Sequence, residues 1–368
     1  MPTSHRILFG PAQATLSDLA DNSVDLVVTS PPYPLIEMWD ESFAAQDESI
    51  AGALKTGDAD LLFDGMHRVL DAVWMQTARL VKPGGFVCIN IGDATRTLNG
   101  VFRLYPNHSR IITFFLRNGF QNLPNIIWRK PTNAPNKFMG SGMLPAGAYV
   151  TLEHEYILVF RKGGKRVFKT DAEKKSRSES AFFWEERNQW FSDCWEFRGT
   201  GQKLTDGLIR ERSGAYPFEL PYRLINMLSL KGDIVLDPFL GTGTTLSAAL
   251  TANRNSIGCE FEPDFAETIH KQVDTDRIPA LNRIVENRLL AHHTFVETRL
   301  ERDYEFKHTN RYFQFPVMTS QETQLMLDYV THVNQTSENE WQASYRSASE
   351  GKPISQPMRG KAGQLTVF

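Results

Sequence analysis

The chain has 368 residues, 41% of them hydrophobic and 23% charged, which excludes an intrinsically disordered chain and gives room for one large domain plus an insert or two smaller domains. The net charge of −3 excludes a generally basic protein, so DNA binding would need a local patch. Its three scattered cysteines argue against a disulfide framework or a cysteine-rich metal site, and we expect no metal. Without a long apolar segment or secretion signal, we expect a cytoplasmic protein without membrane contact.

The first predicted strand, 23–28, is an apolar run that ends at the stretch Thr29-Ser30-Pro31-Pro32-Tyr33. Pro31 and Pro32 lack amide donors, which leaves the carbonyls of Ser30 and Pro31 free to accept hydrogen bonds. The exocyclic amino group of a DNA base would suit such acceptors. Tyr33 offers a flat face on which an extruded base could stack. A strand-ending turn with a packed tyrosine explains the same residues equally well.

Residues 34–60 are acidic and loop-like, and we expect either a solvated surface loop or a mobile cover over a substrate pocket. From 61 to 81, apolar residues recur at three- and four-residue steps, which predicts an amphipathic helix. A buried strand is predicted at 86–91, shortly before Asp93. Because ligands bind at the carboxyl ends of parallel strands, Asp93 should face the same edge as Ser30, as a site residue or as a helix cap.

A helix is predicted at 109–118, followed by strands at 123–129 and 153–161. A loop rich in Asn, Gly and Pro joins the two strands. Loops of this length are usually functional, so Lys130 and Lys137 could contact DNA there, although a plain surface loop is equally consistent.

Residues 161–215 differ in composition: 13 Lys or Arg stand against 9 Asp or Glu, interleaved with Phe and Trp. Basic and aromatic residues together are typical of nucleic-acid binding, because phosphates attract the cations. We therefore predict that Lys165, Arg166 and Lys169 contact DNA. Most of the aromatic residues should form the core of this segment.

A second motif follows the predicted strand 233–237 and precedes a helix at 246–250. Gly241 and Gly243 would let a ligand approach the backbone closely, but the lysine of a phosphate-binding loop is missing. Glu260 ends the next predicted strand, where such folds bind ribose hydroxyls. This combination favours a ligand that contains adenosine.

The two motifs resemble those of the S-adenosylmethionine-dependent DNA amino-methyltransferases. The stretch from Thr29 to Tyr33 looks like their catalytic motif, and 236–245 looks like their cofactor motif. The order, catalytic motif first, matches the permuted β class, and the likeness covers roughly residues 5 to 270. Serine before Pro-Pro is more typical of the N4-cytosine enzymes than of the N6-adenine enzymes.

The resemblance implies a three-layer, Rossmann-like α/β fold with a mostly parallel sheet, S-adenosyl-L-methionine as cofactor, and duplex DNA as substrate. It also implies a cognate restriction endonuclease as a functional partner. The implied catalytic residues are Ser30, Pro31, Pro32 and Tyr33. The implied cofactor-binding residues are Asp93, Phe218, Asp237, Phe239, Gly241, Gly243, Thr244, Thr245, Glu260 and Phe261.

The chain then divides into a catalytic half (1–160), a target-recognition insert (161–215), a cofactor-binding half (216–275) and a C-terminal extension (276–368). In the extension, 278–292 has helical spacing, and the polar, Ser- and Gln-rich end from 331 predicts a loose tail. Three alternatives stay open: an N6-adenine DNA methyltransferase, an RNA or small-molecule amino-methyltransferase, and a DNA-binding module that has lost methyl transfer.

Overall fold

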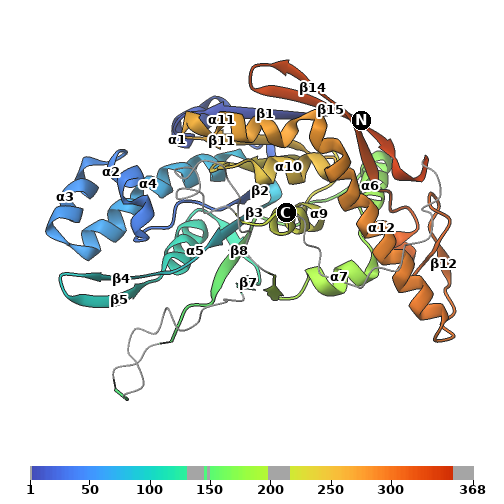
Figure 1. Ribbon diagram of the computed structural model, residues 1–368, viewed down its shortest axis with the longest axis horizontal. Coiled ribbons are helices and arrows are strands. Elements are labelled where there is room, and N and C mark those ends of the chain that lie inside the picture. The colour runs from blue at the N-terminus through green and yellow to red at the C-terminus, as the bar shows by residue number, and fades with distance from the viewer. Residues whose placement is uncertain (1, 131–144, 147–149, 198–215, 351–368) are drawn as a thin grey trace.

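The computed structural model describes residues 2–130, 145–146, 150–197 and 216–350. One large mixed sheet runs through the protein (Figure 1). Its strands, in spatial order, are β14 (Asp328–Ser337), β15 (Glu340–Ser347), β1 (Thr3–Phe9), β11 (Asn255–Glu260), β10 (Ile234–Asp237), β2 (Val24–Thr29), β3 (Val81–Ile91), β8 (His154–Lys162), β7 (Ile126–Arg129) and β9 (Cys194–Glu196), with β6 (Phe120–Asn122) paired to β8. The centre, from β1 to β3, is parallel.

Helices cover both faces of the sheet. Val27 of β2 belongs to a core cluster with Trp74 of α4 (Ala59–Leu80) and Phe115 of α5 (Asn107–Arg117). Its neighbours Leu26 and Val28 point the other way, because side chains alternate along a strand. They share a cluster with residues of α9 (Glu219–Leu228), α10 (Thr244–Thr251) and α12 (Ile278–Leu300). The predicted three-layer α/β fold is therefore confirmed.

The remaining elements are short. The helices are α1 (Ala12–Thr15), α2 (Asp40–Ala44), α3 (Glu48–Thr56), α6 (Asp171–Glu179), α7 (Trp184–Trp190) and α11 (Ala266–His270). In the described part of the chain, two hairpins lie outside the large sheet: β4 (Ala94–Leu98) with β5 (Val101–Tyr105), and β12 (His308–Thr309) with β13 (Pro316–Val317).

Residues 34–60, expected as a loop, are largely helical. Asp47 caps α3 by accepting a hydrogen bond from the Ser49 amide at 2.8 Å. Phe43 and Ile50 are buried among residues of α4. The acidic composition hid these apolar anchors, so the expectation of a surface loop was wrong.

The expected loose tail is also wrong over 331–347. β14 and β15 form a hairpin, and β15 pairs with β1 at the edge of the large sheet. Val333, Trp341 and Ala343 are buried against the layer that contains α10 and α11. Their two-residue alternation gives one apolar face to strands whose average composition is polar. Residues 351–368 lie outside the described residues.

The described part of the predicted insert packs on the C-terminal extension. Arg288 of α12 makes two hydrogen bonds, of 2.6 and 2.8 Å, with the carboxylate of Glu186 in α7. Phe183 is fully buried and stacks on His292 of α12 at 4.1 Å between ring centroids. Trp190 and Trp195 are buried as well, as predicted for aromatic core residues. The insert is therefore built into the body of the protein.

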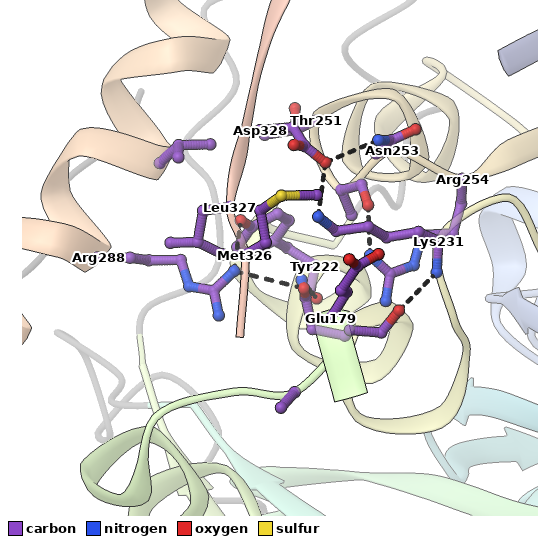
Figure 2. A pocket seen from close by; sticks show the side chains of 15 residues that line it. Glu179, Tyr222, Lys231, Thr251, Asn253, Arg254, Arg288, Met326, Leu327 and Asp328 are labelled. Atoms are coloured by element: carbon purple, nitrogen blue, oxygen red, sulfur yellow. Dashed lines mark hydrogen bonds and ion pairs between the residues drawn. The ribbon is translucent and has the colours of Figure 1, made fainter. Parts of the chain in front are cut away.

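A small cavity of about 20 Å³ lies where α9, α10, α12 and the start of β14 meet (Figure 2). Its walls carry charged side chains that already have partners. Lys231 is paired with Asp328 at 2.6 Å, and Arg254 donates to the Ser229 carbonyl at 2.8 Å. The volume suits about one water molecule, so this cavity cannot hold a nucleobase or a cofactor.

Candidate active site

Both predicted motifs lie at the carboxyl edge of the parallel strands. Leu236 of β10 is in register with Val27 of β2, and Thr29 of β2 is in register with Ile89 of β3. Ser30 and Asp93 therefore follow their strands at the same edge. β8 runs antiparallel to β3, with Tyr156 opposite Ile91, so the residues that begin β8 also lie at this edge.

The hydroxyl of Tyr33 is the centre of a hydrogen-bond network. It donates to Glu155 Oε2 at 2.9 Å and accepts from the Ser30 hydroxyl at 3.2 Å and from Asn90 Nδ2 at 2.8 Å. Asn90 Nδ2 also donates to Glu155 Oε2 at 2.6 Å, and Lys130 Nζ is paired with Glu155 Oε1. Burial and the negative charge of Glu155 raise the pKa of Tyr33 well above its ordinary value, so the phenol stays neutral.

The backbone around Tyr33 is shaped by close packing. An added Cβ at Gly92 would lie 3.0 Å from the Tyr33 ring, so Gly92 lets the ring lie against β3. Pro31 is buried, whereas Ser30, Pro32 and Tyr33 are partly exposed. The predicted catalytic motif thus has partly exposed groups that are held in place by the buried Pro31 and by the packing of Tyr33 against Gly92.

Asp237, predicted to bind the cofactor, instead ties the two motifs together. It is 2% exposed and accepts hydrogen bonds from the Thr29 hydroxyl at 2.6 Å, the Phe239 amide at 3.0 Å, the Tyr216 hydroxyl at 3.1 Å, and the Thr245 hydroxyl. These donors use the lone pairs of both oxygens, so none is left for a ligand. Burial raises the pKa of Asp237, although the hydrogen bonds that it accepts act in the opposite direction.

The glycine loop has the geometry of a ligand cradle. Gly241 has φ +55, and an added Cβ there would meet no atom within 4 Å. Gly243, with φ +85, precedes α10, and its added Cβ would press on Gln272 at 3.1 Å. Thr244 begins α10, and its hydroxyl lies 3.4 Å from that of Thr242. The open space beside Gly241 fits the close approach of a ligand.

Glu260 lies beside this loop at the end of β11. Its carboxylate accepts from the Gly241 amide at 2.7 Å and the Glu262 amide at 2.9 Å, one bond to each oxygen. Each oxygen retains a lone pair, as two hydroxyls of a ribose would need. Burial raises the pKa of Glu260 to about 7.

The other predicted cofactor residues differ in availability. Phe261 is 39% exposed directly after Glu260. Phe239 packs edge-on against Trp74 at 5.5 Å, and Phe218 stacks on Tyr222 at 5.3 Å. Asp93 accepts from the backbone amide of His108 at 3.1 Å and from its ring Nδ1 at 2.8 Å. This geometry favours the helix-cap interpretation of Asp93 over a cofactor contact.

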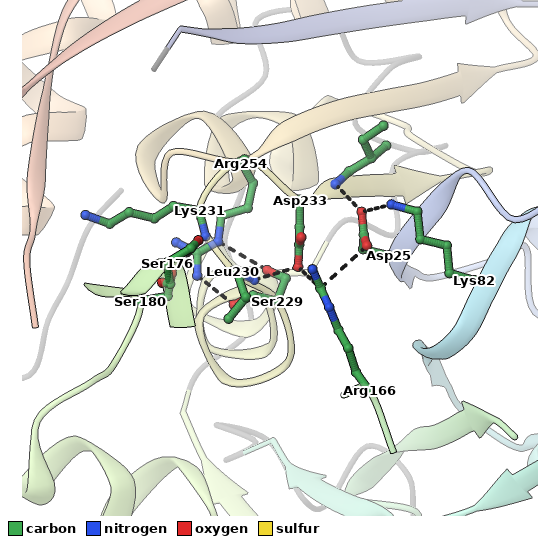
Figure 3. Close-up of polar contacts among 12 residues, drawn as sticks. Asp25, Lys82, Arg166, Ser176, Ser180, Ser229, Leu230, Lys231, Asp233 and Arg254 are labelled. Carbon is green, nitrogen blue, oxygen red and sulfur yellow. Dashed lines mark hydrogen bonds and ion pairs between the residues drawn. The ribbon is translucent and has the colours of Figure 1, made fainter. Parts of the chain in front are cut away.

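The predicted DNA contacts separate into two places. Lys130 lies at the carboxyl edge of the parallel strands, where Ser30 lies and which we call the catalytic edge. It is paired with Glu155, and its Nζ is 4.4 Å from the centroid of the Trp128 ring. Arg166 lies at the opposite end of the strands, 2.7 Å from Asp233 and 3.5 Å from Asp25 (Figure 3). Because β2 spans about 17 Å from that end to Ser30, a DNA contact of Arg166 at the catalytic edge does not fit.

Lys165 and Lys169 flank Arg166 on the same exposed segment, so they are not brought together with the catalytic motif either. Lys137 lies outside the described residues. Within the described residues, no cluster of His, Cys, Asp and Glu could hold a metal ion, and none of the helices is apolar and long enough to span a membrane.

Four groups that build the site were not among the predicted site residues: Thr29, which does stand in the predicted catalytic motif, and Asn90, Glu155 and Tyr216. Glu155 had a detectable signal, since it is a carboxylate at the start of an apolar strand. The antiparallel direction of β8 was needed to place it at the catalytic edge. The direction of a strand does not follow from its own residues.

The comparisons with known proteins agree with this geometry. The model of a DNA methylase family matches residues 24–271. The Type II methyltransferase M.MthZI of Methanothermobacter thermautotrophicus is 48% identical, over 96% of this chain and 98% of that protein. The chain belongs to this family of DNA methylases. A second relative of this methyltransferase, the Type II methyltransferase M.MjaI of Methanocaldococcus jannaschii, is 48% identical over 74% of the chain and 91% of the relative.

Solved structures support the same assignment. A DNA modification methylase of Thermus thermophilus, complexed with S-adenosyl-L-methionine, is 32% identical with a TM-score of 0.54, and the match covers 73% of this chain and 94% of that one. The cytosine-N4-specific PvuII DNA methyltransferase shares the fold, with 18% identity, a TM-score of 0.54, and coverage of 78% and 93%. The protein is a β-class DNA amino-methyltransferase that uses S-adenosyl-L-methionine.

Proposed function

We propose that this methyltransferase moves a methyl group from S-adenosyl-L-methionine to the exocyclic N4 of a cytosine that is flipped out of duplex DNA. The observation that carries the proposal is the 2.6 Å hydrogen bond from the Thr29 hydroxyl to Asp237. It joins the residue before Ser30 to the last residue of β10, which leads into the loop that contains Gly241 and Gly243. An amine at Ser30 and a cofactor beside Gly241 would therefore be held next to each other.

The residues of the glycine loop fit the cofactor. Gly241 leaves space for close approach, Glu260 offers one free lone pair on each oxygen to the ribose hydroxyls, and Phe261 offers an exposed ring to the adenine. Phe218, Phe239, Gly243, Thr244 and Thr245 would shape the rest of this site. Bound S-adenosyl-L-methionine supplies a methyl group on a positively charged sulfur.

The catalytic motif would orient the amine. The lone pair of an exocyclic amine is delocalised into the ring, so the nitrogen is a weak nucleophile. Hydrogen bonds from its N–H groups to the Ser30 hydroxyl and the Pro31 carbonyl would favour a pyramidal nitrogen with a freer lone pair. Tyr33 would stack on the flipped base, and Pro32 would fix the turn between them.

The choice of cytosine rests on Ser30, since serine before Pro-Pro is more typical of N4-cytosine enzymes. The relatives named Type II methyltransferases support a functional partnership with a cognate restriction endonuclease. The basic and aromatic insert, 161–215, would contribute to the recognition of DNA sequence, together with Lys130 beside the catalytic edge and with Lys137.

Mass spectrometry of nucleosides tests the proposal. Duplex DNA, single-stranded DNA and RNA are incubated with the enzyme and S-adenosyl-L-methionine, with Ser30→Ala as the control. We expect N4-methylcytosine from duplex DNA alone. N6-methyladenine in its place would refute the choice of base, and a methylated product from RNA alone would refute DNA as the substrate.

A further inference from the structure

Glu155 lies at the catalytic edge and has no part in the roles assigned so far. Its carboxylate is bonded to the Tyr33 hydroxyl, to Asn90 and to Lys130. Only 13% of its side chain is exposed. Two hydrogen bonds, both made by the Tyr33 hydroxyl, connect this buried carboxylate to the Ser30 hydroxyl, so Glu155 can influence what Ser30 donates or accepts.

The network has only one consistent direction. A carboxylate paired with Lys130 has no proton to donate, so the single proton of the Tyr33 hydroxyl must point to Glu155. Tyr33 then has only lone pairs for Ser30, and the Ser30 hydroxyl must donate its own proton to Tyr33. Ser30 is left with its lone pairs, which can only accept.

Asn90 supports the same direction. Both Glu155 and Tyr33 need a donor from it, so its Nδ2 faces them and its Oδ1 faces away. This Oδ1 is buried and has no hydrogen-bond partner among the described residues. A buried acceptor without a donor points to a ligand or water that carries N–H or O–H groups.

We propose that Glu155 is a positioning residue that acts through Tyr33 and makes the Ser30 hydroxyl an obligatory acceptor for the target amine. The proposal rests on the proposed function, methyl transfer to an exocyclic amine. In that step the nitrogen bonds to the methyl carbon, the carbon–sulfur bond breaks with its electron pair going to sulfur, and the nitrogen then releases a proton to water. Glu155 holds the acceptor in place and receives no proton.

Glu155→Gln should disturb the hydrogen-bond network whichever way the amide turns. With its nitrogen toward Tyr33, it faces the Asn90 donor; with its nitrogen the other way, it faces the Lys130 ammonium. We expect kcat to fall about 100-fold, as for the loss of one aligned hydrogen bond to a reacting group, with KM for DNA little changed. Glu153→Gln is the matched control, since Glu153 is partly exposed and lies 3.6 Å from Arg129, so its kcat should match the wild type.

A double-mutant cycle separates action through Tyr33 from independent action. Tyr33→Phe should lower kcat by about as much as Glu155→Gln, and the double variant should be no slower than Tyr33→Phe alone. Losses that multiply in the double variant would overturn the proposal, as would a Glu155→Gln or Tyr33→Phe enzyme with the wild-type kcat. If Glu155→Gln does not fold, Tyr33→Phe still tests the hydrogen bonds from Ser30 through Tyr33 to Glu155, because it leaves the ion pair of Glu155 with Lys130 in place.

Tyrosine ionisation gives a test that does not depend on methyl transfer. The titration of Tyr33 is followed as the absorbance difference between wild type and Tyr33→Phe. Because the charge of Glu155 is one cause of the raised pKa of Tyr33, Glu155→Gln should shift this ionisation to lower pH. An unchanged ionisation would overturn the proposal. A wild-type enzyme that methylates no DNA base would refute the proposed function and would leave this measurement valid.

Discussion

The two ends of the same parallel strands hold their buried carboxylates in different ways. At the amino ends, Asp25 is paired with Lys82 at 2.8 Å and Asp233 with Arg166 at 2.7 Å (Figure 3). At the carboxyl ends, Asp237 and Glu260 are held by hydroxyl and amide groups, and the described residues place no Lys or Arg within ion-pair distance of either.

This difference separates scaffold from site. A buried carboxylate that is paired with a cation has its charge neutralised inside the protein, so it has little to offer a ligand. A buried carboxylate that is held only by neutral donors keeps a raised pKa, and one that retains free lone pairs, as Glu260 does, can still respond to a ligand. The two ends can therefore be told apart by how substitutions act on catalysis, cofactor binding and stability.

Loss of the acceptor at the catalytic edge should have the largest effect. Ser30→Ala should lower the rate of methyl transfer by about 100- to 1,000-fold, because the hydrogen bond to Ser30 matters most as the nitrogen becomes pyramidal. Affinities for DNA and S-adenosyl-L-methionine should change little. Single-turnover kinetics with calorimetry of both ligands checks this. A rate within about threefold of wild type would remove Ser30 from the mechanism.

Filling the cofactor space should have the next largest effect. Gly241→Leu should abolish binding of S-adenosyl-L-methionine, because the side chain would occupy the open space beside the loop and also requires an unfavourable positive φ. Gly119→Leu is the matched control, since Gly119 has φ +79 and open space around its added Cβ but lies after α5. Calorimetry should show wild-type affinity for that control. Equal losses in both variants would mean that backbone strain, and not lost space, is the cause.

The carboxylate of Glu260 predicts a smaller, pH-dependent effect. If ribose hydroxyls donate to it, the ionised form binds better, so affinity for S-adenosyl-L-methionine should fall by up to about tenfold for each pH unit below 7. Binding near pH 7 should release protons, which calorimetry in buffers of different ionisation enthalpy detects. Glu260→Gln should bind more weakly and should lose this dependence. A wild-type affinity that is flat from pH 5.5 to about 8 would contradict the role of Glu260.

The same raised pKa affects folding in the opposite direction. The unfolded chain loses the Glu260 proton near the ordinary value of 4.5, whereas the folded protein keeps it until about pH 7. The contribution of this group to stability is therefore full below about 4.5 and is lost as pH rises toward 7. Cofactor binding thus favours the ionised form of Glu260, whereas folding favours the protonated form. This opposition is expected for a buried carboxylate whose role is to bind a ligand.

The sequence predicted the parts of the fold that rest on local patterns. Apolar runs located β2, β3 and β10, and the three- and four-residue spacing located α4. Interactions between distant residues were not predictable. The hairpin of β14 and β15 depends on pairing with β1, more than 300 residues earlier, and Glu155 reaches the site only because β8 runs antiparallel. Arg166 looked like a DNA contact because composition does not reveal Asp25 and Asp233 as its partners.

The amino ends should respond least, and only in stability. Arg166→Met removes the ion-pair partner of Asp233, but Asp233 still accepts a hydrogen bond from the Leu230 amide at 2.7 Å. Asp25 likewise keeps its ion pair with Lys82. Because the Arg166 side chain is 39% exposed, water screens the ion pair, and the free energy of unfolding should fall by only about 1 kcal/mol. Denaturant unfolding measures this, and Lys165→Met, on the same exposed segment, should leave stability unchanged.

The same variant decides on which side of the protein DNA lies. If Arg166 bound a DNA phosphate, replacing it with Met would reduce the salt dependence of DNA binding by about one unit of log-log slope. Since Arg166 lies at the end of the strands opposite to Ser30, we expect the slope and the methylation rate of Arg166→Met to equal those of the wild type. A reduced slope would show that DNA also reaches the amino ends, and the ion pairs there could no longer be assigned to the scaffold alone.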